Sequence, residues 1–544
     1  MESYLIQLLL IVAGSIAVLH ADPDLSNPLN LPTKWSFEQK LSDDYVQGSI
    51  WPNPQAQKPD GKVFSLLPNK FSFSINGKTS DVLKAAVNRY MNLTFPDFTV
   101  TKKDDKLPFM EGAEVIVVDD YKPMDLTTDE SYTLTVTAPQ SSIYAYTVWG
   151  ALRGLETFSQ IVHQSEDGMY YAKGNKIEDY PRFHHRAFMI DTSRHYLKLS
   201  IIKKFLDAMS YAKFNVLHWH VVDDQSFPFQ SQTFPSLSDQ GSFNNKTHVY
   251  SPADVADIID YARMRGIRVI PEFDTPGHTY SWRSIPNLLT KCCDAKGKPT
   301  GSLGPIDPTI DSNYDFLKAF FGEVAKRFPD QYIHLGGDEV GFGCWQSNPN
   351  ITAWMEKMRF GTNYSKLEEY YETKLLNIIG GLGKQYIIWQ EVVDNDVKVL
   401  PDTVVNVWKG GWPAELAKVT GAKKLKAILS SPWYLNYISY GIDWPNYYKV
   451  EPTDFEGTDQ EKELVIGGTG CMWGEFVDGT NILARTWPRA LAIAERLWSS
   501  KSTTDMTSAY ARIWEHRCRY LLRGIPAEPA VEAKFCRKEW PIDE

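Results

Sequence analysis

The sequence predicts an α/β protein in which a (β/α)8 TIM barrel follows a smaller α/β domain. After Pro181, apolar runs that end in polar or glycine-rich turns alternate with longer amphipathic segments, a pattern typical of parallel strands joined by helices. Before Pro181, short runs alternate polar and apolar residues, as half-exposed strands do. The 544 residues are 43% hydrophobic, enough for a large core, which excludes a mainly disordered chain.

The first domain, residues 22–180, is expected to form a small sheet with helices on one face. Its strands are expected at 71–75, 113–118 and 131–137, and its helices at 81–91 and 142–160. We find no pattern of catalytic residues in this domain. Residues 181–544 then form the barrel and a C-terminal extension.

Eight strand-then-helix units follow one another in the second domain, which is the number that closes a barrel. The strands are expected at 187–191, 216–222, 268–273, 332–335, 386–389, 404–407, 427–429 and 464–468. Helices between them are expected at 200–212, 252–264, 313–327 and 367–380. An open doubly wound sheet is the alternative, but no glycine-rich phosphate loop follows any of these strands.

Chemically useful side chains gather just after these strands, where a barrel would turn them toward one shared cavity. In the run 334–340, Asp338 and Glu339 follow two glycines. Paired carboxyls suit glycosidic chemistry, because one can stay protonated as a general acid while the other stays ionised. Adjacent Asp and Glu residues on a solvated surface usually have no catalytic role. The prediction of an active site therefore depends on the other residues that gather at the same strand ends. The other residues at these strand ends are Arg194, Asp223, His278, Trp389, Trp408, Tyr434, Trp473 and Glu475.

Composition narrows the possible partners. The net charge is −10 and no basic face is visible, which argues against nucleic acid as a partner. The 17 tryptophans favour a carbohydrate ligand, since indole faces stack on sugar rings, although most tryptophans in any protein belong to the core. No spacing resembles a zinc site, so we predict neither a metal nor a cofactor.

The N-terminus predicts entry into the secretory pathway. Residues 4–19 are apolar except for Gln7 and Ser15, and we expect a signal peptide, 1–21, cleaved near Ala21. The alternative is an uncleaved anchor, because no Lys or Arg precedes the apolar run. No later segment is apolar enough to span a membrane, and the mature chain is expected to be lysosomal or secreted. Glycosylation sequons occur at Asn92, Asn245, Asn350 and Asn363.

Six cysteines fit the same oxidising compartment. Cys518 and Cys536 are predicted to close a short loop near the C-terminus. Cys344 can form a disulfide with Cys292 or with Cys293, and the sequence alone leaves this choice open. Of the two, we take Cys293 as the predicted partner. The sixth, Cys471, lies in an apolar run and is expected to be a buried free thiol.

Five motifs in this order resemble family 20 β-N-acetylhexosaminidases of the animal lysosomal type. They are the segments 191–197, 218–224, 271–278, 334–340 and 471–475. The resemblance is dense over the barrel and looser over the first domain. It implies an exo-acting, retaining enzyme that removes terminal β-linked GlcNAc or GalNAc from glycoconjugates or chitooligosaccharides. It also implies a homodimer, because members of this family usually dimerise.

The resemblance implies hydrolysis without a protein nucleophile, an exception to the two-carboxylate scheme. The 2-acetamido oxygen of the substrate attacks the anomeric carbon and forms an oxazolinium intermediate. Glu339 is then the general acid and base, with a pKa expected to be raised by burial and a nearby negative charge. Asp338 orients the acetamido N–H, and Tyr434 donates a hydrogen bond to the acetamido oxygen. The walls of the pocket are Trp389, Trp408 and Trp473.

The remaining site residues are expected to hold the sugar. Arg194 and Asp223 bind ring hydroxyls, or else form a structural salt bridge that braces the barrel. Glu475 receives the C4 or C6 hydroxyl. His278 lies near the acid pair, with a purely structural histidine as the alternative, and Asp224 is structural.

Asn436 and Tyr437 bear on the substrate. The family's α-type subunits carry Asn followed by Arg here, and the β-type Asp followed by Leu. Because Tyr437 replaces the arginine, neutral GlcNAc and GalNAc are favoured over sulfated sugars.

An endo-chitinase would need a spaced acidic run on one strand, which is absent. A silent sugar-binding protein is disfavoured because Asp338, Glu339 and Tyr434 are all present.

Overall fold

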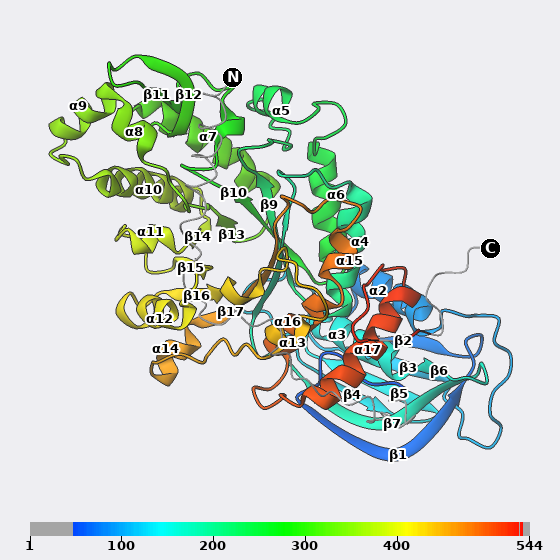
Figure 1. Ribbon diagram of the computed structural model, residues 1–544. Helices are drawn as coiled ribbons and strands as arrows, with labels where there is room; N and C mark the ends of the chain where they lie inside the picture. Colours follow the sequence, from blue (N-terminus) through cyan, green and yellow to red (C-terminus); the bar gives the residue numbers. More distant parts are fainter. Residues whose placement is uncertain (1–46, 533, 537–544) are drawn as a thin grey trace. The chain divides into compact units, whose positions relative to one another are not determined.

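A ring of eight parallel strands forms the barrel in the computed structural model, which describes residues 47–532 and 534–536 (Figure 1). The predicted signal peptide and residues 22–46 lie outside these described residues. Each strand pairs with the next along the chain, and the last pairs with the first. The strands are β8 (His185–Asp191), β9 (Val216–Val222), β10 (Arg268–Phe273), β13 (Tyr332–His334), β14 (Gln385–Trp389), β15 (Val404–Val407), β16 (Lys426–Leu429) and β17 (Val465–Met472). The predicted barrel and all eight of its strands are confirmed.

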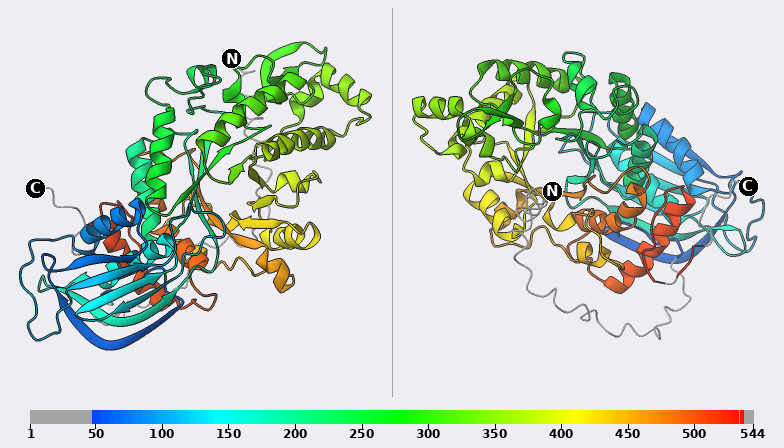
Figure 2. Two further views of the ribbon diagram at one scale, coloured as in Figure 1. Left: turned by 180° about the vertical axis from the view of Figure 1, so that it is seen from behind. Right: turned by 45° about the horizontal axis from the view of Figure 1, so that its top comes forward.

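Helices lie outside this ring (Figure 2). The long ones between strands are α4 (Leu199–Tyr211), α6 (Pro252–Arg263), α7 (Asp311–Arg327) and α10 (Tyr364–Gly381), each within a few residues of its predicted range. Local chemistry sets where α6 begins: Ser251 accepts a hydrogen bond from the backbone N–H of Asp254, whose carboxylate accepts one in return. Shorter helices and the last two are α5 (Ser236–Gly241), α8 (Gly343–Ser347), α9 (Pro349–Lys357), α11 (Glu391–Asp394), α12 (Trp412–Ala417), α13 (Trp444–Tyr448), α14 (Asp459–Glu463), α15 (Ile482–Thr486), α16 (Arg489–Trp498) and α17 (Met506–Leu522).

A mixed sheet precedes the barrel, with two helices packed against one face as predicted (Figure 1). The helices are α2 (Asp81–Thr94) and α3 (Val148–Ile161). The strands, in spatial order, are β1 (Ala56–Leu66), β7 (Tyr170–Asp179), β4 (Tyr132–Val136), β5 (Gln140–Ala145), β3 (Gly112–Val117) and β2 (Ser72–Gly77), and β6 (His163–Gln164) pairs with β7.

The helix predicted at 142–160 is wrong at its beginning. Residues 142–145 belong to β5, which lies between β4 and β3 in the sheet. The helix begins only at Val148, because Thr147 is extended and its hydroxyl accepts a hydrogen bond from the N–H of Gly150. Pairing with β4, just before β5 in the chain, and with the more distant β3 therefore overrides the helical pattern of these residues.

The disulfide Cys518–Cys536 is confirmed, and the pairing of Cys344 with Cys293 is wrong. Cys344 is bonded to Cys292 instead. Both candidate cysteines lie on β11 (Leu289–Cys293), which pairs with β12 (Pro299–Ile306). Successive side chains on a strand point to opposite faces, so only one of the two can meet Cys344 on α8. Cys471 is buried and unpaired, as predicted.

One buried carboxylate joins the first domain to the barrel. Glu130 accepts hydrogen bonds from Arg153 of α3 at 2.8 Å and from Arg186 of β8 at 2.6 Å. It also accepts one from Asn215, just before β9, at 2.8 Å. Burial opposes the charged form, but the two guanidinium groups outweigh it and lower the pKa of Glu130 to about 2.

Within the part of the chain that the structure describes, every helix is too short or too polar to cross a lipid bilayer.

We expect Glu130→Gln to lower the free energy of unfolding by about 3–5 kcal/mol, because it leaves two buried guanidinium groups without a counter-charge. Urea unfolding at neutral pH measures this loss. A depressed carboxyl pKa stabilises the fold above the unfolded pKa and loses that effect as pH falls through the folded value. The difference between the variant and the wild type should therefore shrink as pH falls from about 4.5 toward 2.

The matched control is Glu178→Gln, which breaks an exposed ion pair with Lys176. This change should alter the free energy of unfolding by less than about 1 kcal/mol. Equal losses in the two variants would contradict the role assigned to Glu130.

Candidate active site

The loop after β13 carries the acid pair and is fixed by two glycines. Gly336 and Gly337 have φ angles of 70° and 94°. A Cβ at Gly336 would lie 1.8 Å from Asp274 Oδ1, and one at Gly337 would lie 2.5 Å from Val392 Cγ2. The N–H of Gly337 donates to Asp274 Oδ1 at 2.9 Å. Only glycine fits these positions. The two glycines therefore allow the backbone conformation that places Asp338 at the mouth of the barrel.

Asp338 and Glu339 lie side by side in opposite environments. Asp338 is 7% exposed, whereas the Glu339 side chain is 60% exposed and its backbone is left-handed, with φ 50°. Such backbone strain is typical of functional sites. Burial raises the pKa of Asp338. The expected raised pKa of Glu339 is wrong for this structure: contact with His278 lowers it.

His278 lies among three carboxylates. Its Nδ1 lies 3.1 Å from Asp223 Oδ1, and its Nε2 lies 3.6 Å from Glu339 Oε2 and 3.9 Å from Asp338 Oδ2. Burial lowers the pKa of His278, but these carboxylates outweigh it and raise it well above the ordinary value. The imidazole is therefore positively charged. As the sequence predicts, it lies near the acid pair.

Arg194 forms the ion pair that the sequence left as an alternative. Its Nη2 lies 2.9 Å from Asp223 Oδ2, and its Nη1 donates to Asp191 Oδ2 at 3.1 Å. The guanidinium also lies 5.0 Å from the ring centre of Trp473. Nε of Arg194 is buried and has no hydrogen-bond partner among the described residues.

Four aromatic rings form a closed box, here called the aromatic box: Trp389, Trp408, Tyr434 and Trp473. The ring centres of neighbours around the box lie 6.1–6.4 Å apart. The rings come from the ends of four consecutive strands, β14 to β17. The indole N–H groups of Trp389 and Trp408 donate to Glu272 and Glu391, both at 2.8 Å. The three predicted tryptophans and Tyr434 are therefore brought together.

The other predicted residues lie around this box. Burial raises the pKa of Tyr434 well above its ordinary value, so its hydroxyl stays a proton donor. Tyr437 is 71% exposed and stacks on Tyr434 with ring centres 6.3 Å apart. Asn436 is half-buried, and Glu475 is exposed just after Trp473. Asp224 accepts a hydrogen bond from the backbone of Tyr280 at 2.8 Å, in line with a structural role.

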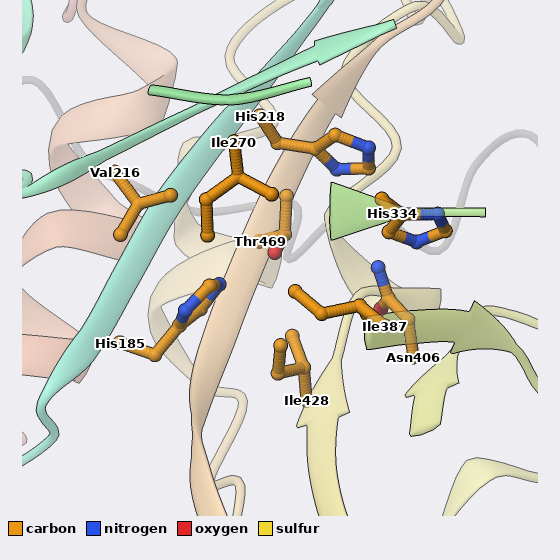
Figure 3. Close-up of a pocket in the computed structure, with 9 residues that line it drawn as sticks. All are labelled: His185, Val216, His218, Ile270, His334, Ile387, Asn406, Ile428 and Thr469. Atoms are coloured by element: carbon orange, nitrogen blue, oxygen red, sulfur yellow. The ribbon is translucent and has the colours of Figure 1, made fainter. Parts of the chain in front are cut away.

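Several charged groups beneath the site, chiefly His220, Glu272 and Asp274, have no role in the prediction from sequence. A signal was present, because these groups interrupt apolar strands or follow them directly, and charged residues are seldom buried without a partner. The barrel interior below them is filled by side chains from all eight strands, which point toward one another in Figure 3. These are His185, Val216, His218, Ile270, His334, Ile387, Asn406, Ile428 and Thr469.

Among the residues that the structure describes, three groups of side chains have atoms close enough together to hold a cation, all within 4.8 Å. They are His218, Glu272 and His334; Asp223, Asp274 and His278; and His278, Asp338 and Glu339. In each group an imidazole already lies against a carboxylate. The absence of a metal stays a prediction.

Comparisons with known proteins agree over nearly the whole chain. The family model "Glycosyl hydrolase family 20, catalytic domain" matches residues 183–501, and "beta-acetyl hexosaminidase like" matches residues 50–161. Beta-hexosaminidase subunit alpha of Rattus norvegicus is 48% identical over 507 residues, covering 90% of this chain and 96% of that one. Beta-hexosaminidase subunit beta of Homo sapiens is 49% identical over 505 residues, covering 90% of each.

Solved structures share the fold. A chitobiase of Flavobacterium johnsoniae superposes with a TM-score of 0.76 at 28% identity, covering 87% of this chain and 72% of that one. A family 20 β-N-acetylhexosaminidase of Streptomyces coelicolor gives a TM-score of 0.70 at 22% identity, covering 90% of this chain and 98% of that one, a likeness of fold alone.

We expect His278→Asn to raise the pKa of the Glu339 carboxyl, because the change removes the positive charge that favours its ionised form. A ¹³C NMR titration of protein labelled at the glutamate carboxyl carbon measures this shift, with Glu339→Gln identifying the resonance. Asp224→Asn, which leaves His278 unchanged, should not move the same resonance. An unchanged Glu339 titration in the His278 variant would contradict the assigned contact.

Proposed function

The chain belongs to glycosyl hydrolase family 20, and on that premise we propose that Asp338, Glu339 and Tyr434 are its catalytic residues. The protein is a glycoside hydrolase, an exo-acting β-N-acetylhexosaminidase that removes terminal GlcNAc or GalNAc with retention of configuration. The observation that carries the residue assignment is the aromatic box closed beside the acid pair.

The acetamido group of the substrate fits this box. The rings surround its methyl group, the Tyr434 hydroxyl donates to its oxygen, and Asp338 accepts from its N–H. These contacts hold the oxygen in position to attack the anomeric carbon, and fixed geometry of this kind accounts for much of a rate enhancement. As the oxazolinium forms, positive charge grows on the nitrogen. The Asp338 carboxylate offsets that charge more strongly in the transition state than in the substrate.

Glu339 donates the proton to the leaving oxygen and later removes one from water. Its exposure and its contact with His278 hold its pKa low in the structure described here. A bound sugar would cover the carboxyl and take it out of water, which favours the protonated form. We infer that substrate binding itself raises the pKa of Glu339 to the value that a general acid needs.

The sugar ring is held by groups around the rim of the box. Trp473 stacks beneath the ring, and the guanidinium of Arg194, held by Asp191 and Asp223, binds ring hydroxyls. Asp223 and Asn436 accept or donate to ring hydroxyls near them. Glu475, exposed beside Trp473, receives the C4 or C6 hydroxyl.

We infer passage through the secretory pathway to a lysosomal or extracellular destination. The four sequon asparagines, Asn92, Asn245, Asn350 and Asn363, are all exposed, as glycosylation requires. The natural substrate is an oligosaccharide or glycoconjugate, and a homodimer stays a prediction from the family resemblance.

Glu339→Gln should lower kcat for a fluorogenic β-GlcNAc by about 1,000-fold or more, because the amide cannot donate a proton to the leaving oxygen. Affinity for free GlcNAc, measured by calorimetry, should stay within about threefold, since the side-chain shape is kept. The control, Asp224→Asn, should keep wild-type turnover. Wild-type turnover in the Glu339 variant would contradict its role, and a wild type that binds GlcNAc without cleaving any substrate would point to a sugar-binding protein.

Tyr437→Arg should raise the rate on 6-sulfo-β-GlcNAc relative to β-GlcNAc by about 10–100-fold, because a charge-assisted contact to the sulfate contributes about 1.5–3 kcal/mol. The ratio of kcat/KM for the two sugars measures this change. Tyr440→Arg, with the same charge on a more exposed residue of the loop, should give a smaller gain. A wild type that already cleaves both sugars equally well would overturn the assignment of Tyr437 to neutral specificity.

A further inference from the structure

A single carboxylate at the centre of the barrel contacts both halves of the active site. Glu272, on β10, is fully buried. Its Oε1 accepts the indole N–H of Trp389 at 2.8 Å. Its Oε2 lies 2.6 Å from Nε2 of His218 and 2.8 Å from Nδ1 of His220.

The first contact fixes one wall of the aromatic box. Trp389 is 1% exposed, and its indole N–H points down into the barrel at Glu272 rather than toward the mouth. His334 packs against the same indole with ring centres 4.7 Å apart. Nδ1 of His334 accepts the N–H of Gly336 at 3.1 Å, so this histidine also holds the beginning of the acid loop.

The second contact, between Glu272 and His220, is connected to Glu339 by a series of groups whose charges alternate in sign. His220 Nε2 contacts Asp223 Oδ2 at 2.8 Å, Asp223 Oδ1 contacts His278 Nδ1 at 3.1 Å, and His278 faces Glu339 at 3.6 Å. Burial lowers the pKa of His220, but Glu272 and Asp223 outweigh it and raise it to about 10. The imidazole between two carboxylates is thus a cation, and its orientation depends on both of them.

We propose that Glu272 is a positioning residue that holds Trp389 and His220 together and so sets the place of the acetamido group relative to Glu339. This inference rests on the proposed function. Stability alone does not explain a charge here, because replacing a buried ionic group with an apolar one of similar volume is often neutral or stabilising. The role lies in geometry, and a displacement of ~1 Å at a reacting centre can cost ~100-fold in rate.

Glu272→Gln tests this directly. The amide oxygen can still accept from Trp389, but its NH2 group cannot pair with the His220 cation as the carboxylate does. We expect kcat/KM for the fluorogenic β-GlcNAc to fall about 10–100-fold. Affinity for the bicyclic thiazoline analogue of the intermediate should fall by a similar factor, while affinity for GlcNAc changes less than threefold. A structural defect alone would weaken both ligands together.

The matched control is Glu368→Gln on α10. Glu368 is equally buried and accepts a hydrogen bond from Asn395 at 2.8 Å, outside the contacts of Glu272. Burial raises its pKa to about 7, so the carboxyl is already neutral at acidic pH and the amide mimics it. Wild-type kinetics are expected for this variant.

A second measurement applies if the Glu272 variant fails to fold. Trp389→Phe and His220→Gln each remove one of the two contacts, and the double variant combines them. If both act through Glu272, the loss in the double variant is smaller than the product of the single losses.

Two results would overturn the proposal in a wild type that is active: an unchanged preference for the thiazoline in Glu272→Gln, or purely multiplicative losses in the double variant. A wild type without activity would instead refute the proposed function.

Discussion

Closure of the eight-stranded barrel is the constraint on which the whole site depends. The rings of the aromatic box follow four different strands, and the acid pair follows a fifth, with more than a hundred residues between the first and last of them. No local segment could hold these groups together. Because β17 pairs back with β8, Arg194 and Trp473, almost 280 residues apart in the sequence, come within contact of each other.

Closure also forces charged groups into a dry interior, where they must balance one another. Carboxylates and cations alternate from Glu272 through His220, Asp223 and His278 to Glu339. An unpaired charge at any of the buried places would be costly, so each buried group favours the charged form of the next. The same balance explains why the pKa of Glu339 is lowered rather than raised. It faces a cation that the buried carboxylates keep protonated.

The sequence was sufficient for features that depend on local periodicity, and insufficient for those that depend on distant neighbours. The barrel strands are short apolar runs followed by turns, so their positions could be predicted, and so could the residues that follow them. The strand at 140–145 could not, because it pairs not only with its neighbour β4 but also with β3, which lies more than 20 residues earlier in the chain. The choice between Cys292 and Cys293 depended on which face of a strand meets α8. The pKa of Glu339 depended on His278, which lies 61 residues earlier in the chain.

In the mechanism that we propose, the acetamido oxygen is the nucleophile and Tyr434 and Asp338 position it. The most direct test is kcat/KM for a series of β-glucosaminides whose N-acetyl group carries none, one, two or three fluorine atoms. Fluorine withdraws electrons from the carbonyl oxygen and makes it a poorer nucleophile. If the acetamido oxygen is the nucleophile, kcat/KM should fall steeply with each added fluorine. Values of kcat/KM that do not change along the series would contradict this mechanism.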